Sequence, residues 1–452
     1  MIYFILAEVK TMQKVEEKIL ENGLEIVAVK KDNLPIFQLS LVISAGSVDD
    51  PRGKEGLANL TASLLDEGSK KYTSIEIFEK FEELGTEFSI SAGNWSTTIS
   101  LKSLTENAEK SLEIFSEVLL NPTFPSEELE KLKKRTISNI ISQKGDPDYV
   151  VRLLLDKELY RKHPLSHPIE GYENTIMNIG RDDIVNFYSK FYLPNNSILV
   201  VVSSLEPKKA ISLVEKYLSK WKRGELKREY IENIEYPKEK EMLVYHFPGI
   251  NQAYVFLGAK GISRTNKDFT KLRVVNYMFG GSGFSSRITK VIRVKYGYAY
   301  WSYSSLDPGY RRNNAIYEGA FIAGFSTKIG SANHAIELLL EELNKAINEG
   351  FTQEELDASK SYYEGSIARQ VQTYSQVASI IINAKIWKIP YDYWLRDIQE
   401  IKDLKLEEVN KTAKEYLPKN FVVVVLADTT QYKPNVKGFD RVEIKEFKAI
   451  EN

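Results

Sequence analysis

The chain contains one sequence pattern twice. Residues 192–203 read Tyr-Leu-Pro-Asn-Asn-Ser-Ile-Leu-Val-Val-Val-Ser, and residues 416–427 read Tyr-Leu-Pro-Lys-Asn-Phe-Val-Val-Val-Val-Leu-Ala. A second pair has nearly the same spacing, because Phe124 begins the run Phe-Pro-Ser-Glu-Glu-Leu and Phe351 begins the run Phe-Thr-Gln-Glu-Glu-Leu. Two matches at nearly one offset indicate an internal duplication. We therefore expect two copies of one folding unit.

The length of the chain supports this division. With 452 residues, each copy is long enough to bury a core of its own without disulfides or metal. We expect an N-terminal repeat at residues 1–221 and a C-terminal repeat at residues 242–452. Residues 222–241 are rich in charges of both signs and lack an apolar period, which indicates a solvated linker. An ordinary surface loop is the alternative.

Strand-like and helix-like runs cluster within each copy. In the first copy we expect strands at residues 24–29 and 36–44 and a long helix at about residues 127–143. In the second copy, a helix near residues 269–279 and a glycine-rich turn precede a helix that ends at residue 295. This order predicts the α+β class, with helices packed on one face of each sheet.

Composition excludes several classes of function. The 61 basic and 62 acidic residues give a net charge of −1, which disfavours nucleic acid and membrane surfaces as partners. The absence of cysteine excludes thiolate catalysis and disulfides. The apolar patch at residues 2–7 is too short for a signal peptide or a membrane span, because Glu8 and Lys10 interrupt it. A cytoplasmic location is the default expectation, and an exported compartment stays open.

Four short motifs occur in a shared order. They are Gly-Leu-Ala at residues 56–58, Leu-Asp-Glu-Gly at 65–68, His-Pro at 163–164 and Arg-x-x-x-Gly-x-Ala-Tyr at 293–300. Together they resemble the pitrilysin and insulinase (inverzincin) family of zinc peptidases, which includes the mitochondrial processing peptidase and its bacterial relatives. The resemblance covers essentially the whole chain. It implies two homologous domains, each an antiparallel-rich sheet with helices on one face, that form half of a peptidase clamshell.

The family's zinc motif is degenerate in this chain. The motif His-x-x-Glu-His places two ligands four residues apart on one helical face, with a glutamate that deprotonates the metal-bound water. The resemblance puts Asn59, Ala62 and Ser63 at these positions, and Ser138 or Asn139 where a third ligand is expected. Asparagine and serine are weak zinc ligands, and alanine cannot accept a proton. We therefore expect no catalytic zinc on this chain.

The histidines do not replace this motif. His163 and His167 are four residues apart, but Pro164 and Pro168 disfavour a helix that could pair them. The other two histidines are isolated, and a lone histidine is more often a surface or hydrogen-bonded core residue than a ligand. The sequence therefore offers no rival metal cluster.

The resemblance also assigns roles in the C-terminal repeat. Family members have an arginine that binds the substrate backbone and a tyrosine that donates to the developing oxyanion, in trans where the zinc belongs to a partner chain. Arg293 and Tyr300 occupy these places. A donor placed in advance at an oxyanion is worth roughly 3 kcal/mol. The alternative is that Arg293 is a solvated helix residue and that Tyr300 fills a core.

A glycine-rich run precedes this pair. Gly281, Ser282, Gly283 and Phe284 are candidates for binding an extended peptide, because glycine lets the backbone approach a ligand closely. A plain turn between helices is the alternative. It is not a phosphate loop, because no Gly-Lys-Ser/Thr follows.

Aromatic residues cluster around the pair. Tyr296, Tyr298, Tyr300 and Trp301 could line a peptide channel. Alternating aromatic residues on a strand equally often pack across the sheet.

These observations lead to one main hypothesis. The chain is expected to be inactive alone and to act as the zinc-less subunit of a heterodimeric metallopeptidase. Its expected partners are a homologous zinc-bearing subunit and extended or unfolded peptides. A pseudopeptidase that serves as a scaffold or peptide-binding protein is the alternative, and an enzyme with a rearranged metal site is a third option.

Overall fold

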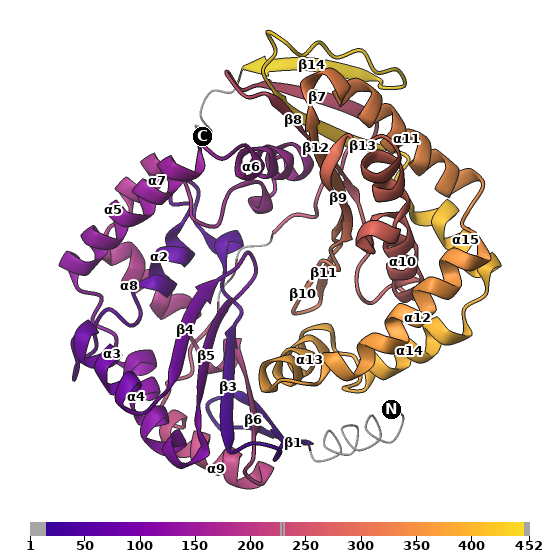
Figure 1. Cartoon of the computed structure of the whole chain (residues 1–452). Coiled ribbons are helices and arrows are strands. Elements are labelled where there is room, and N and C mark those ends of the chain that lie inside the picture. The colour runs from indigo at the N-terminus through magenta and orange to yellow at the C-terminus, as the bar shows by residue number, and fades with distance from the viewer. Residues whose placement is uncertain (1–14, 227, 229–230, 447–452) are drawn as a thin grey trace. The chain divides into compact units, whose positions relative to one another are not determined.

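The computed structural model describes residues 15–226, 228 and 231–446 (Figure 1). The apolar patch at residues 2–7 lies outside this part of the chain. None of the helices in the described ranges is long and apolar enough to cross a membrane.

The described residues form two compact units. Each unit takes one segment from the other repeat, and we call 141–167 and 367–391 the exchanged segments. The units therefore cut across the repeats expected at residues 1–221 and 242–452, and the main passage between them falls within residues 222–241. Unit 1 comprises residues 15–140, 168–228 and 367–391, and unit 2 comprises residues 141–167, 231–366 and 392–446.

Unit 1 contains a six-stranded sheet in the order β1-β2-β6-β3-β5-β4. Strands β2 and β6 pair in parallel, and the other neighbours are antiparallel. The strands are β1 (Val15–Ile19), β2 (Glu25–Lys30), β3 (Ile36–Ile43), β4 (Glu87–Ala92), β5 (Thr97–Leu104) and β6 (Ser197–Ser203).

Unit 2 contains a six-stranded sheet in the order β14-β7-β13-β8-β12-β9. Strand β7 pairs in parallel with β13 and β14, and the other neighbours are antiparallel. Its strands are β7 (Lys240–His246), β8 (Gln252–Lys260), β9 (Ala299–Leu306), β12 (Ala320–Lys328), β13 (Phe421–Ala427) and β14 (Arg441–Glu446), and β10 (Tyr310–Arg312) and β11 (Ala315–Tyr317) form a separate hairpin.

The two sheets have the same internal topology. The repeated sequence pattern leads into β6 in unit 1 and β13 in unit 2, and each of these strands lies between equivalent neighbours. The outer strand differs, because β1 precedes its neighbour β2 and is antiparallel, whereas β14 comes last and is parallel to β7. The predicted α+β class with two homologous domains is confirmed.

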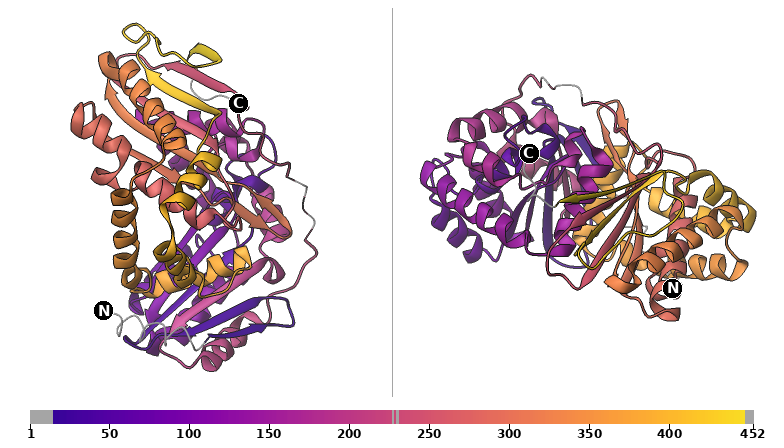
Figure 2. Two further views of the ribbon diagram at one scale, coloured as in Figure 1. Left: turned by 90° about the vertical axis from the view of Figure 1, so that its right-hand side faces the viewer. Right: turned by 90° about the horizontal axis from the view of Figure 1, so that it is seen from above.

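In each unit, most of the helices pack as one layer on one face of the sheet (Figure 2). Alternate strand residues such as Leu39 and Leu41 in unit 1 and Val255 and Leu257 in unit 2 belong to the cores beneath these layers. In unit 1 the helices are α2 (Leu57–Ser63), α3 (Ser74–Glu83), α4 (Ala108–Leu120), α5 (Ser126–Gln143), α7 (Glu173–Asn178), α8 (Arg181–Phe191) and α9 (Pro207–Leu218). In unit 2 they are α10 (Phe269–Asn276), α11 (Ala332–Asn348), α12 (Gln353–Gln370), α14 (Tyr393–Asp403) and α15 (Leu406–Tyr416).

The exchanged segments each supply a helix to the opposite sheet face. Helix α13 (Tyr374–Trp387) packs on β6 and β3, and α6 (Pro147–Tyr160) packs on β13 and β8. The contact in unit 2 is close, because a Cβ added at Gly258 would lie 2.9 Å from Leu155 Cδ1 and 3.1 Å from Leu159 Cδ2. These helices explain why the central strands are buried on both faces.

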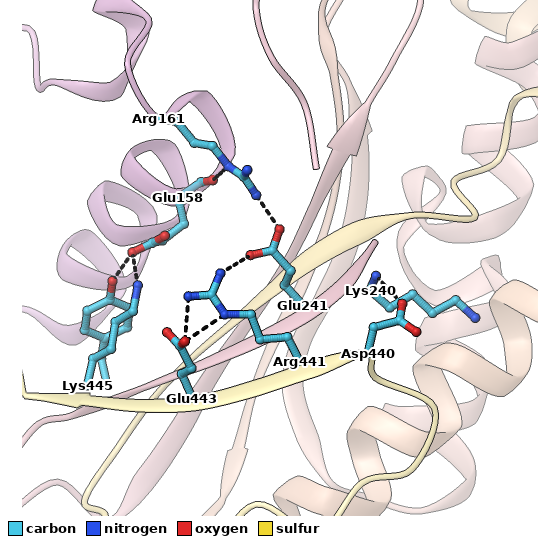
Figure 3. Close-up of polar contacts among 9 residues, drawn as sticks. Glu158, Arg161, Lys240, Glu241, Asp440, Arg441, Glu443 and Lys445 are labelled. Carbon is cyan, nitrogen blue, oxygen red and sulfur yellow. Dashed lines mark hydrogen bonds and ion pairs between the residues drawn. The ribbon is translucent and has the colours of Figure 1, made fainter. Parts of the chain in front are cut away.

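Polar contacts fasten α6 to the edge of its sheet (Figure 3). Arg161 pairs with the buried carboxylate of Glu241 on β7, and Arg441 of β14 approaches the same carboxylate at 3.5 Å. Glu158 accepts a hydrogen bond from Lys445 Nζ at 2.7 Å. Unit 1 has a matching arrangement, because the hydroxyl of Tyr374, in the exchanged segment, lies 2.7 Å from Leu34 O and 2.8 Å from Lys31 O.

Candidate functional site

The structure brings Phe284, Arg293 and Tyr300 together. The guanidinium carbon of Arg293 lies 4.2 Å from the centre of the Phe284 ring and 5.1 Å from that of the Tyr300 ring. Tyr300 is 82% exposed and Phe284 is 65% exposed, while Arg293 is half-buried. We call these three side chains the Arg293 stack. A cation held between two aromatic faces has a restricted position, and the phenol of Tyr300 remains open to solvent.

A wide helical turn positions the stack. Arg293 belongs to the π-helical segment Thr289–Lys295, where an ordinary helix was expected. The segment ends with the amide of Tyr296 donating to Val291 O at 3.2 Å, and Gly297 follows with φ of +65°. A side chain at Gly297 would be strained, so glycine permits the reversal into β9. π-Helical turns are rare and are frequent at functional sites.

The glycine-rich run packs against strand β9. A Cβ at Gly280 would lie 2.4 Å from Ser304 Oγ and 2.5 Å from Ser304 N, so this glycine is required by a contact within the fold. Gly281 and Gly283 are exposed, and Gly283 has φ of +59°. The close contact with β9 therefore explains why residue 280 is a glycine. Substrate binding by residues 281–284 stays a prediction.

The segment before the stack also covers the outer edge of β9. Thr289 Oγ1 donates to Ser302 O at 3.1 Å, and Asn276 Oδ1 accepts from Ser304 Oγ at 2.7 Å. Strand β9 reads Ala-Tyr-Trp-Ser-Tyr-Ser-Ser-Leu and has no charged residue. Sheet edges are commonly protected by charged side chains or by a covering segment. The edge of β9 is protected by a covering segment.

An ion pair missed by the sequence reasoning anchors this segment. Arg287 donates from Nε and Nη2 to the two carboxylate oxygens of Glu355, at 2.7 Å each. Burial acts to raise the pKa of Glu355, but the bonds from Arg287 and from the Thr352 amide lower it overall. Glu355 lies in the repeated Phe-Thr-Gln-Glu-Glu-Leu run, which was a signal available in the sequence.

The aromatic residues divide into two groups. The Tyr298 hydroxyl lies 3.0 Å from Nδ1 of His334, and the Tyr296 ring centre lies 5.1 Å from that of His334. Trp301 instead packs against Tyr303 and Phe256, with 5.7 Å between ring centres in both pairs. Packing across the sheet therefore accounts for Trp301, whereas Tyr296 and Tyr298 pack with His334 of α11.

The degenerate metal positions lie on α2 and α5. Asn59 and Ser63 are half-buried on α2, and Ala62 is 1% exposed. Ser138 and Asn139 are exposed on α5. In the part of the chain that the structure describes, no group of three or more His, Cys, Asp or Glu side chains could hold a metal ion. The donors present at these positions do not fit zinc, which prefers imidazole, thiolate and carboxylate ligands.

An aspartate fixes the start of α2. Asp50 Oδ2 accepts from the Gly56 amide and Oδ1 from the Ala58 amide, each at 2.7 Å. Burial raises the pKa of Asp50 well above its usual range. This helix start therefore has a local cause in Asp50, which the sequence reasoning missed.

The histidines have structural partners. His163 Nδ1 accepts from the Leu165 amide at 3.1 Å and caps a short 3₁₀ turn, and burial lowers the pKa of His163 to about 4. His246 Nδ1 accepts from the Thr429 amide at 3.1 Å, and His334 contacts a tyrosine as described above. These contacts agree with the interpretation that a lone histidine is a surface or hydrogen-bonded core residue.

Comparison with known proteins agrees with this architecture. A family model described as insulinase (peptidase family M16) matches residues 26–173, and one described as peptidase M16 inactive domain matches residues 178–363. Together the two models cover more than half of the chain.

Individual relatives match large parts of the chain. The Helicobacter pylori protein named non-peptidase homolog YmxG is 25% identical over 400 residues, which cover 87% of this chain and 90% of that one. The mitochondrial-processing peptidase subunit beta of Caenorhabditis elegans is 23% identical and covers 58% of this chain and 56% of its own.

A solved structure extends the likeness to three dimensions. The structure of a peptidase M16 inactive domain from Pseudomonas fluorescens has a TM-score of 0.86 and 26% identity, and covers 93% of this chain and 99% of that chain. The resemblance drawn from the four sequence motifs is thereby confirmed. The chain belongs to the M16, or insulinase, family of peptidases.

Proposed function

We propose that this chain is the metal-free subunit of a two-chain peptidase and that Arg293 and Tyr300 complete the active site of its partner. The observation that supports the proposal is the display of the Arg293 stack, in which Tyr300 is 82% exposed. A single exposed ring needs no explanation, but the exposed rings of Phe284 and Tyr300 gather around one cation, and such clusters are typical of interaction surfaces. The positions of the family's zinc motif, in contrast, hold Asn59, Ala62 and Ser63.

In this proposal each side chain of the pair has a role of its own. The Arg293 guanidinium is restrained by two rings and has donors for a peptide carbonyl of the substrate. The Tyr300 hydroxyl is a donor for the oxygen that becomes negative when a peptide carbonyl is attacked. Because both groups are in place before substrate arrives, little reorganisation opposes the reaction.

The remaining chemistry belongs to the proposed partner. A homologous chain with an intact His-x-x-Glu-His motif would supply the zinc-bound water that attacks the carbonyl. The likeness to a protein named as a subunit of the mitochondrial processing peptidase supports a paired arrangement. Extended or unfolded peptides are the proposed substrates.

Reconstitution tests this proposal. The purified chain is mixed with a homologous zinc-bearing chain of the same organism, and peptide cleavage is measured against each chain alone. We expect the mixture to cleave and the Arg293→Ala/Tyr300→Phe double variant to fall by at least roughly a hundredfold. The matched control is Arg396→Ala/Tyr362→Phe, which changes another exposed arginine and tyrosine. An equal rate for both double variants would refute the proposal.

A second candidate is a scaffold or peptide-binding protein with no catalytic role. The name of the Helicobacter pylori relative, a non-peptidase homolog, favours it. This candidate predicts that the double variant still assembles with its partner and that the complex loses no activity. An enzyme with a rearranged metal site would instead contain stoichiometric zinc after purification, which elemental analysis detects.

A further inference from the structure

A cavity of about 270 Å³ in unit 2 has cations at its rim and no acidic residue in its lining. It lies beside α11, next to the first residues of β7 and β13. Its floor includes the buried side chains of Leu343, Pro418 and Phe421. Lys240, Lys419 and Lys437 contribute to its rim, together with the amide side chains of Asn344 and Asn348. We call it the lysine cavity.

The three lysines have no carboxylate partner among the described residues. The ammonium of Lys240 lies 6.0 Å from the centre of the Phe421 ring, above the floor of the cavity. Asp440 is near Lys240 but accepts the backbone amide of that residue at 2.9 Å (Figure 3). Lys345 of α11 differs from these three lysines, because it pairs with Glu341 at 2.8 Å and Glu342 at 3.0 Å.

The charge of the cavity is local. The whole chain has a net charge of −1, so no general positive field accounts for three cations around one small cavity. A neighbouring groove along α11, of about 500 Å³, shares Leu340, Asn344, Asn348 and Lys437 with the lysine cavity, and its lining adds Lys345 and three glutamates, Glu337, Glu341 and Glu349. An anion is therefore favoured on the side of the lysine cavity, where the lining has three lysines and no carboxylate.

We infer that the lysine cavity binds a small amphipathic anion. Its carboxylate or phosphate head would lie among the three ammonium groups and the two amides, where charge-assisted hydrogen bonds are strongest. Its apolar chain would cover the half-buried side chains of Leu340 and Ile347 and remove them from water. A cavity of about 270 Å³ has room for a small amphipathic molecule, and octanoate is a suitable probe. This inference is independent of the proposed peptidase role.

Titration calorimetry on the full chain tests the inference with four probes. Octanoate and octyl phosphate contain both head and chain, acetate contains only the head, and octan-1-ol contains only the chain. We expect saturable binding of one or both amphipathic anions, at least roughly tenfold tighter than acetate or octanol. The stronger of the two anions identifies the head group. Binding should weaken at high salt, because the rim lysines are accessible to screening ions.

Variants locate the site. The triple change Lys240→Gln/Lys419→Gln/Lys437→Gln should weaken octanoate binding by roughly tenfold or more. The control Lys345→Gln, beside the acidic groove, should leave it unchanged. Thermal unfolding of the triple variant checks that the fold is intact. Equal affinities for octanoate and octanol, an unaffected triple variant, or no saturation below ~1 mM would each overturn the inference.

Discussion

Unit 1 and unit 2 have the same strand order but differ in how their polar side chains are used. In unit 1, Asn59 and Ser63 lie on α2 where the sequence motifs predicted zinc ligands, and their donors suit zinc poorly. In unit 2, the Arg293 stack presents an exposed phenol and a restrained cation. Helix α2 still begins at a defined residue, because Asp50 accepts two of its first amides. The comparison teaches that the start of α2, where the sequence predicted a degenerate zinc motif, has a local cause that does not require a metal.

The exchanged helices provide a second comparison between the units. Helix α6 is seated closely over Gly258 and is fastened by ion pairs at a sheet edge. Helix α13 is fastened by the buried hydroxyl of Tyr374. The contact of α6 at Gly258 depends on packing, and the contact of α13 through Tyr374 depends on hydrogen bonds. Substitutions at the two places should therefore have different costs.

The largest effect on stability is expected from Gly258→Leu. The new side chain would overlap Leu155 and Leu159, whose atoms lie 2.9 Å and 3.1 Å from an added Cβ. Overpacking of this kind costs about 3 kcal/mol of unfolding free energy, measured by urea denaturation. The control is Gly365→Ala on α12, where a Cβ meets nothing within 4 Å and the helix should gain up to ~1 kcal/mol. Similar denaturation midpoints for both variants would show that α6 is not closely seated.

A smaller effect is expected from Tyr374→Phe in unit 1. The change removes the hydroxyl near Leu34 O and Lys31 O and leaves these backbone groups, of which Lys31 O is buried, with fewer partners. The expected loss of unfolding free energy is about 1–2 kcal/mol. Tyr362→Phe is the matched control, because Tyr362 is 46% exposed. If Tyr374→Phe and Tyr362→Phe have the same unfolding free energy, the Tyr374 hydroxyl does not stabilise the exchanged segment.

Only part of this organisation could be predicted from sequence. The repeated run at β6 and β13 predicted equivalent strands, because a continuous valine-rich segment is buried in any sheet. The same pattern implies that both faces of the strand are covered, but it does not say by which helix. Pattern analysis also does not reveal the close packing of α6 at Gly258.

The candidate site was likewise only partly predictable from the sequence. The family resemblance predicted the pair Arg293 and Tyr300, but it did not predict the π-helical turn that contains Arg293 or the contacts of segment 276–295 with β9. The glycine-rich run was predicted either to bind a peptide or to form a turn, and at Gly280 the close contact with Ser304 is within the fold. Glu355 was overlooked because the pairing with Arg287 joins residues far apart in the sequence.

The smallest effect concerns pH and compares an aspartate from each unit. Burial raises the pKa of Asp156 in unit 2 to about 7, against a lowering by Arg152, and burial raises that of Asp66 in unit 1 to about 6. A raised carboxyl pKa favours the protonated folded form, so stability present below about pH 4 is lost as the pH rises through these values. Asp156→Asn should therefore be more stable than the unchanged chain at pH 8, by on the order of 1 kcal/mol, and equal to it near pH 4.

Thermal unfolding between pH 4 and pH 8 measures this difference. Asp66→Asn should give a smaller gain at pH 8, because its pKa is raised less. A gain that is the same at every pH would show that the substitution acts through something other than the carboxyl charge.

The most direct measurement of the central claim is kcat of the mixed complex with Tyr300→Phe in this chain. If Tyr300 donates to the oxyanion in the partner's active site, kcat should fall by roughly a hundredfold or more with little change in KM. Tyr362→Phe should leave kcat unchanged. A kcat for Tyr300→Phe within about twofold of the unchanged complex would contradict the account, because no donor worth several kcal/mol could then be missing.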